Sequence, residues 1–110
     1  RIRLSQKKNN LNFDTGLHED KNIKILKIKR KRNKHGDFIT MRGICKQRPS
    51  TYPSFNIMYY DEDGIPLLQI DKYFKCIGKN HIARASFALP GYDSEHFKEA
   101  VDYTIEWIKE

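Results

Sequence analysis

Hydrophobic and polar residues alternate with a period of two along most of the chain after residue 21. Isoleucines and lysines alternate in residues 22–30 around an offset Leu26, a pattern typical of a half-buried strand. The same alternation predicts further strands over residues 37–47, 55–61, 67–77, 82–89 and 103–107. Short segments rich in Gly, Pro, Asn and Asp separate these stretches. The chain is therefore predicted to be all-β.

Two glycines carry specific predictions. Asp63-Gly64 follows the strand pattern of residues 55–61 and is a hairpin signal, because glycine accepts a positive φ. Gly43 falls on the predicted inward face of residues 37–47. A glycine inside a strand usually marks a bulge or a close approach by a neighbouring element. We therefore expect a larger side chain at Gly43 to overpack the interior.

The C-terminal residues fit two templates. Hydrophobic residues recur at helical spacing from Phe97 to Ile108, and Ser94 could cap such a helix. Tyr103, Ile105 and Trp107 also alternate strictly with polar residues, in residue types that favour strands. We predict a short helical turn over residues 95–100, followed by a closing strand.

Charge is distributed unevenly along the 110 residues. Residues 1–48 hold 15 Lys and Arg against 4 Asp and Glu, whereas residues 49–110 hold 6 against 10. Residues 1–21 show no sustained periodicity, and we expect them to form a flexible basic arm before a domain of residues 22–110. A basic half of this kind suits nucleic acid or another anionic polymer as a partner, although lysines also protect exposed strand edges.

The length and composition indicate one folded domain. The aromatic fraction of 12% supports a packed core, and no uncharged stretch approaches the roughly 20 apolar residues of a membrane helix. The first residue is Arg1 rather than Met, so we expect a processed or truncated piece of a longer protein.

Several motifs resemble the FxLYD family of bacterial immunoglobulin-like envelope domains. Met41-x-Gly43-x-Cys45-x-Gln47 resembles the Val-x-Gly-x-Val-x-Asn strand of that family, and Ile57-Met58-Tyr59-Tyr60-Asp61 with Asp63-Gly64 resembles the motif that names it. Phe87 and the strand at residues 103–107 are similar to its later elements. The resemblance implies an immunoglobulin-like antiparallel β-sandwich in an exported or surface-anchored bacterial protein. It implies a noncatalytic spacer or binding module without a cofactor.

A second resemblance covers less of the chain. Ser86-Phe87-Ala88-Leu89, Tyr92 and the helical spacing of residues 97–108 are similar to the last strand and helix of AP2-type DNA-binding domains. That alternative implies DNA binding by a basic three-stranded sheet. It requires a long helix over residues 94–109. We favour the sandwich because the chain offers five clear strand patterns and no consistent Arg or Trp row on one of them.

The candidate site residues are four cations, one methionine and one tyrosine. A basic run formed by Lys29, Arg30, Lys31 and Arg32 could contact an anionic polymer or a protein, and it could equally be a solvated hairpin end. Met58 and Tyr60 are predicted to face away from Ile57, and thus to be candidates for a surface patch. No motif points to catalytic, cofactor-binding or metal-binding residues, so an enzyme is the function class that we favour least.

Cys45 and Cys76 are the two cysteines of the chain. Their separation permits a disulfide like that of antibody domains, which export would favour. Because Cys45 lies where the related family has valine, we favour a buried free thiol that packs as a small hydrophobic residue.

Overall fold

The computed structural model describes residues 2–4, 17–90 and 97–109. This part of the chain forms seven strands and contains no helix. The strands are β1 (Ile2–Leu4), β2 (Ile23–Asn33), β3 (Gly36–Cys45), β4 (Ser54–Tyr60), β5 (Pro66–Tyr73), β6 (Ile82–Ala88) and β7 (Asp102–Trp107).

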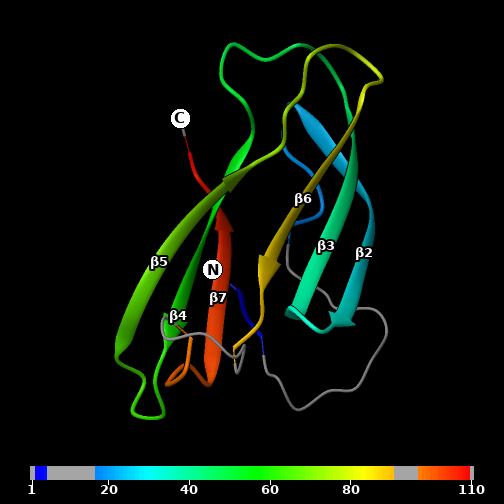
Figure 1. Cartoon of the computed structure of the whole chain (residues 1–110). Coiled ribbons are helices and arrows are strands. Elements are labelled where there is room, and N and C mark those ends of the chain that lie inside the picture. The colour runs from blue at the N-terminus through cyan, green and yellow to red at the C-terminus, as the bar shows by residue number, and fades with distance from the viewer. Residues whose placement is uncertain (1, 5–16, 91–96, 110) are drawn as a thin grey trace.

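The strands form two antiparallel sheets that pack face to face (Figure 1). One sheet has the order β1-β7-β4-β5 and the other has the order β2-β3-β6. The prediction of an all-β antiparallel sandwich is thus confirmed.

The core lies between the sheets and follows the alternation along each strand. In β3, every second residue from Ile39 to Cys45 is buried, and β4 buries Phe55, Ile57 and Tyr59. Phe87 of β6 contacts Tyr103 of β7 at a ring-centroid distance of 5.5 Å, which joins the two sheets. A core of such aromatic and aliphatic residues is what stabilises a two-layer fold.

A β-bulge in β2 sets the direction of the lysines in this strand. Ile25 pairs with Gly43 and Lys27 pairs with Arg42, so Leu26 is the extra residue. Without the bulge, Lys24 and Lys27 would lie on opposite faces of the strand. With it, Ile25 and Ile28 both turn towards the core while the lysines on either side turn outwards.

Gly43 lies where the expected close approach occurs. A Cβ atom at this position would stand 2.8 Å from Cδ1 and 2.9 Å from Cγ1 of Ile23, and 3.0 Å from the carbonyl oxygen of Lys24. The inward position of Gly43 is therefore confirmed. The hairpin at Asp63-Gly64 is also confirmed: Gly64 has a φ of 78°, and its N–H donates to the carbonyl of Asp61.

The segment expected to be a flexible arm is partly described. Residues 2–4 form β1, which pairs with residues 103–105 of β7. Leu17 is buried, and Glu19 forms an isolated bridge with Lys24. Residues 1 and 5–16 lie outside the described residues. The described fold thus extends on the N-terminal side of the expected boundary at residue 22.

The C-terminal residues form the expected closing strand. β7 occupies Asp102–Trp107, so the helix over residues 94–109 that the DNA-binding alternative requires is not formed. Of the helical turn expected at residues 95–100, the described part is a turn in which the N–H of Ala100 donates to the carbonyl of Phe97. Residues 95 and 96 lie outside the described residues.

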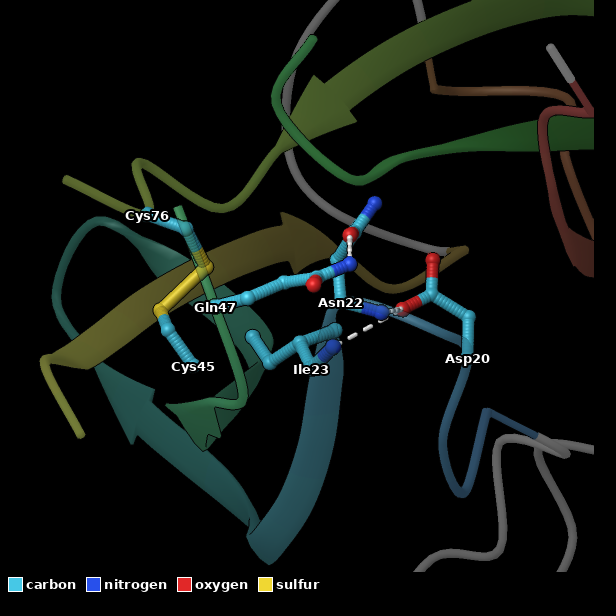
Figure 2. Close-up of a disulfide and its surroundings, with 6 residues drawn as sticks. All are labelled: Asp20, Asn22, Ile23, Cys45, Gln47 and Cys76. Carbon is cyan, nitrogen blue, oxygen red and sulfur yellow. Dashed lines mark hydrogen bonds between the residues drawn. A yellow bond between two sulfur atoms is a disulfide. The ribbon is translucent and has the colours of Figure 1, made fainter. Parts of the chain in front are cut away.

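Cys45 and Cys76 form a disulfide, so the favoured free thiol is wrong (Figure 2). Cys45 ends β3 and Cys76 lies in the loop between β5 and β6, with 5.7 Å between the two Cα atoms. Both residues are buried. A hydrogen bond also joins this loop to the end of β3: the N–H of Asn80 donates to the carbonyl of Cys45 over 2.7 Å.

Hydrogen bonds beside the disulfide order the entry to β2 (Figure 2). Oδ1 of Asp20 accepts from the backbone N–H groups of Asn22 and Ile23 over 2.7 and 2.8 Å. Nε2 of Gln47 donates to Oδ1 of the buried Asn22 over 2.8 Å. The start of β2 and the end of β3 are thereby held together next to the cross-link.

Candidate functional site

The outer face of the three-stranded sheet carries six exposed cations. We call this surface the basic face, and its cations are Lys24, Lys27, Lys29, Lys31, Arg42 and Arg84. The other outward residues of these paired positions are uncharged: Phe38, Thr40, Ile44, Ile82, Ser86 and Ala88. The paired positions therefore carry positive charge and no carboxylate. At one end of the face, Glu19 forms an isolated bridge with Lys24 and an ion pair with Lys46.

The strand register arranges the central cations in a row. Arg42 of β3 pairs with Lys27 of β2 on one side and with Arg84 of β6 on the other. The next outward row along the strands is Lys29, Thr40 and Ser86. Directly opposed side chains in an antiparallel pair have Cβ atoms about 4.5–5.5 Å apart. The row thus places three like charges side by side.

A shallow groove runs over these two rows. Its volume is about 390 Å³, and its walls include Lys27, Lys29, Arg42 and Arg84 together with Thr40 and Ser86. Oγ1 of Thr40 donates to the carbonyl of Lys29 over 3.2 Å. Within the described residues, Lys27, Lys29, Arg42 and Arg84 take part in no ion pair. Their charges face solvent, where an anionic ligand can reach them.

The predicted basic run does not act as one patch. Lys29 and Lys31 lie on the basic face, whereas the side chains of Arg30 and Arg32 both contact Asp37. Nε of Arg30 donates to both carboxylate oxygens of Asp37, over 2.9 and 3.0 Å, and its Nη2 also donates to Oδ2. Nε of Arg32 donates to Oδ2 over 3.2 Å. Half of the run is therefore paired within the hairpin, where one carboxylate contacts two guanidinium groups.

The electrostatics of Asp37 reflect this pairing. Partial burial by itself would raise the pKa of the carboxyl group, but hydrogen bonds from Arg30 and Arg32 outweigh it and hold the pKa below its usual value. The side chain of Arg30 is only 12% exposed, so Asp37 compensates a guanidinium group that is largely withdrawn from water. We therefore assign the cluster of Arg30, Arg32 and Asp37 a role in the stability of the hairpin.

Met58 and Tyr60 lie in the other sheet, on β4. Tyr60 is buried, and its hydroxyl lies 3.2 Å from Oγ1 of Thr104, with which it forms a hydrogen bond. Met58 is half-buried between its strand partners Gln69 and Thr104. The expectation of an exposed Tyr60 is wrong, because alternation fixes which face of a sheet a residue occupies but not what covers that face.

Lys27, Arg42 and Arg84 are site residues that sequence reasoning missed. The outward position of Arg42 follows from the alternation in β3, and the lysines of β2 are visible in the sequence. A row across three strands, however, depends on the register of β2 and β6 against β3 and on the bulge at Leu26. Alternation within one strand does not predict that these three cations lie in one row.

Comparison with known proteins adds no relative to this description. No family model, no curated protein and no solved structure matches the chain. Among residues 2–4, 17–90 and 97–109, no helix is long and apolar enough to cross a membrane. Over the same residues, no group of three or more His, Cys, Asp or Glu side chains is placed to hold a metal ion.

Proposed function

We propose that this chain is a noncatalytic binding domain of an exported or surface-anchored bacterial protein, and that it binds an anionic polymer through the basic face. The observation that carries the proposal is the row of Lys27, Arg42 and Arg84 over a groove with no carboxylate in its walls. Like charges directly opposite each other in a sheet are destabilising. A ligand of opposite charge would offset that cost.

Two features support an extracytoplasmic, immunoglobulin-like domain. The buried Cys45–Cys76 disulfide is a cross-link typical of oxidising compartments. The FxLYD-like motifs also fall on a strand and a hairpin: Met41, Gly43 and Cys45 lie in β3, which ends before Gln47, and Asp63-Gly64 forms the hairpin between β4 and β5.

The side chains of the groove suit binding rather than chemistry. Lysine, arginine and hydroxyl groups attract and orient anions, whereas acid–base catalysis needs a group that titrates near the working pH. The walls of the groove contain no His, Cys, Asp or Glu. We therefore assign the groove no catalytic role.

Nucleic acid is the second candidate ligand. A basic, three-stranded antiparallel sheet is the element that the AP2-like alternative uses for binding, and β2-β3-β6 has that arrangement. Phosphate contacts from such a face would bind nucleic acid without reading its sequence. The proposal of an extracytoplasmic polymer is preferred because of the disulfide.

Binding to two polyanions at low ionic strength tests the proposal. Inorganic polyphosphate and poly-glutamate would be titrated into the wild type and the double variant Arg42→Gln/Arg84→Gln. The wild type should bind at least one polymer, and the variant should lose tenfold or more in affinity. The slope of log K against log salt should also shrink by roughly 0.7–0.9 for each phosphate that the variant no longer neutralises.

Lys72→Gln/Lys98→Gln is the matched control, because it removes the same charge from exposed positions outside the basic face. It should bind nearly as tightly as the wild type. Equal losses in both double variants would show that net charge alone drives binding. If neither polymer binds the wild type, the basic face is no polyanion site and a spacer role becomes the better explanation.

A further inference from the structure

Resting on the proposed function, the geometry points to a more specific ligand: we propose that Arg42, Arg84 and Ser86 form a phosphate subsite, and that the polymer is a chain of singly charged phosphates without bases. The three residues lie on adjacent strands and share the walls of one groove. Their side chains combine two planar cations with one neutral hydroxyl donor.

Two arginines occupy directly paired positions on the basic face. Arg42 and Arg84 are directly paired across β3 and β6, and both are exposed. The planar fork of a guanidinium group matches phosphate or carboxylate through two parallel hydrogen bonds, whereas lysine acts as a point charge. A tetrahedral phosphate, unlike a planar carboxylate, presents its oxygens in more than one plane. A directly opposed pair of arginines can therefore contact separate oxygens of a single tetrahedral group.

The two hydroxyl groups in the groove walls, those of Thr40 and Ser86, differ in whether they can donate a hydrogen bond to a ligand. Oγ1 of Thr40 already donates to the carbonyl of Lys29, so this hydroxyl has no proton left for a ligand. The hydroxyl of Ser86 has no hydrogen bond within the described residues, and this residue follows Arg84 on the same face of β6. Ser86 is thus the available neutral donor beside the arginine pair.

Two lysines extend the site beyond one phosphate. Lys27 lies at the far end of the row that contains Arg42 and Arg84, and Lys29 lies next to it in the second outward row. Neighbouring strands are about 4.8 Å apart, so the row spans about 10 Å across the sheet. That length suits consecutive charges of a polymer better than one small anion.

The face offers little for nucleobases. Binding of single strands depends on aromatic side chains on which bases stack. Phe38 is the one aromatic residue among the outward residues of the paired positions on β2, β3 and β6, and it is half-buried outside the groove. The groove thus offers contacts to phosphates and no aromatic side chain to bases. A phosphate polymer without bases can therefore make the same contacts as a nucleic acid.

The double variant Arg42→Lys/Arg84→Lys tests the subsite, because it keeps the charge and removes the forks. Affinities for inorganic polyphosphate and poly-glutamate of equal charge would be measured at one ionic strength. The wild type should prefer polyphosphate by tenfold or more. The variant should bind both polymers about equally, because its loss of affinity for polyphosphate should exceed its loss of affinity for poly-glutamate.

Arg48→Lys is the control, since Arg48 is exposed in the loop after β3 and lies outside the groove walls; it should keep the full preference. Circular dichroism would confirm that the variants remain folded.

If the wild type binds the two polymers equally, the phosphate subsite is wrong while the proposed polyanion function stands. Absence of binding to either polymer overturns both. Tenfold tighter binding of a single-stranded oligonucleotide with the same number of phosphates would replace the base-free polymer by nucleic acid.

Discussion

Asp37 pairs with the two arginines of the basic run. It accepts hydrogen bonds from Arg30 and Arg32, whereas the strand register turns Lys29 and Lys31 outwards onto the basic face. Gly43 has a different structural role, because the absence of a Cβ atom lets Ile23 pack over β3. At the residue scale, one carboxyl group and one missing side chain thus shape the same sheet.

The Asp37 pairing predicts a pH-dependent contribution to stability. Because the pKa is lowered in the folded state, the stabilisation is present above the ordinary value of 3.8 and is lost as the pH falls through the lower folded-state pKa. Asp37→Asn should lower the free energy of unfolding by about 1–3 kcal/mol at neutral pH. In urea titrations, this difference should shrink as the pH is lowered below 3.8, and a difference independent of pH would contradict the argument.

Gly43→Ala should lower the free energy of unfolding by about 1–3 kcal/mol, because the added Cβ atom would overlap Ile23 and the Lys24 carbonyl. Gly78→Ala is the control, since a Cβ atom there meets nothing within 4 Å. Thermal unfolding of the two variants would make the comparison. Equal melting temperatures would mean that Ile23 moves aside without cost.

At the scale of elements, the three-stranded sheet combines a packed inner face with an outer face of opposed like charges. The bulge at Leu26 makes this possible, because it keeps isoleucines inside and lysines outside on both of its sides. β2 is also an edge strand, so its lysines would discourage pairing with another sheet. The lysines of β2 would thus both protect this edge and contribute to the proposed binding.

The opposed charges predict that loss of a binding residue stabilises the fold. Arg42→Gln should raise the free energy of unfolding by about 0.2–1 kcal/mol at low ionic strength, because it relieves repulsion by Lys27 and Arg84. The gain should diminish in high salt. Arg48→Gln, outside any strand pair, should show no such gain. Destabilisation by Arg42→Gln would show that its side chain supports the sheet.

At the scale of the whole molecule, the disulfide ties the three-stranded sheet to the loop that leads from the other sheet. Cys45 and Cys76 are 31 residues apart in sequence, and the closed loop contains β4 and β5. The cross-link therefore restricts the unfolded chain over more than one element. Its loss should therefore change the free energy of unfolding of the whole domain.

Removal of the disulfide should lower the free energy of unfolding by about 3–4 kcal/mol, according to the entropy of closing a loop of this length. Cys45→Ala/Cys76→Ala would be compared with the oxidised wild type in denaturant titrations. Reduction of the wild type should produce a similar loss, whereas it should leave the double variant unchanged. A loss below about 1 kcal/mol would show that the cross-link adds little.

The sequence by itself determined the elements that depend on local patterns. Period-two alternation located the strands from residue 22 onwards, Asp63-Gly64 located a hairpin, and the inward phase of Gly43 located a close approach. The positions and faces of these elements follow from alternation and turn residues within a short stretch of sequence, although that stretch does not identify the segment that approaches Gly43. The closing strand at Asp102–Trp107 also followed from alternation, although helical spacing competed with it.

Only the tertiary structure decided the features that join distant segments. The Cys45–Cys76 pairing, the burial of Tyr60 against Thr104 and the row of Lys27, Arg42 and Arg84 each depend on how strands far apart in sequence are aligned. A shift of one residue in register would turn every side chain of a strand to its other face. Register is set by the packing of the whole core, so local alternation cannot specify which cations meet.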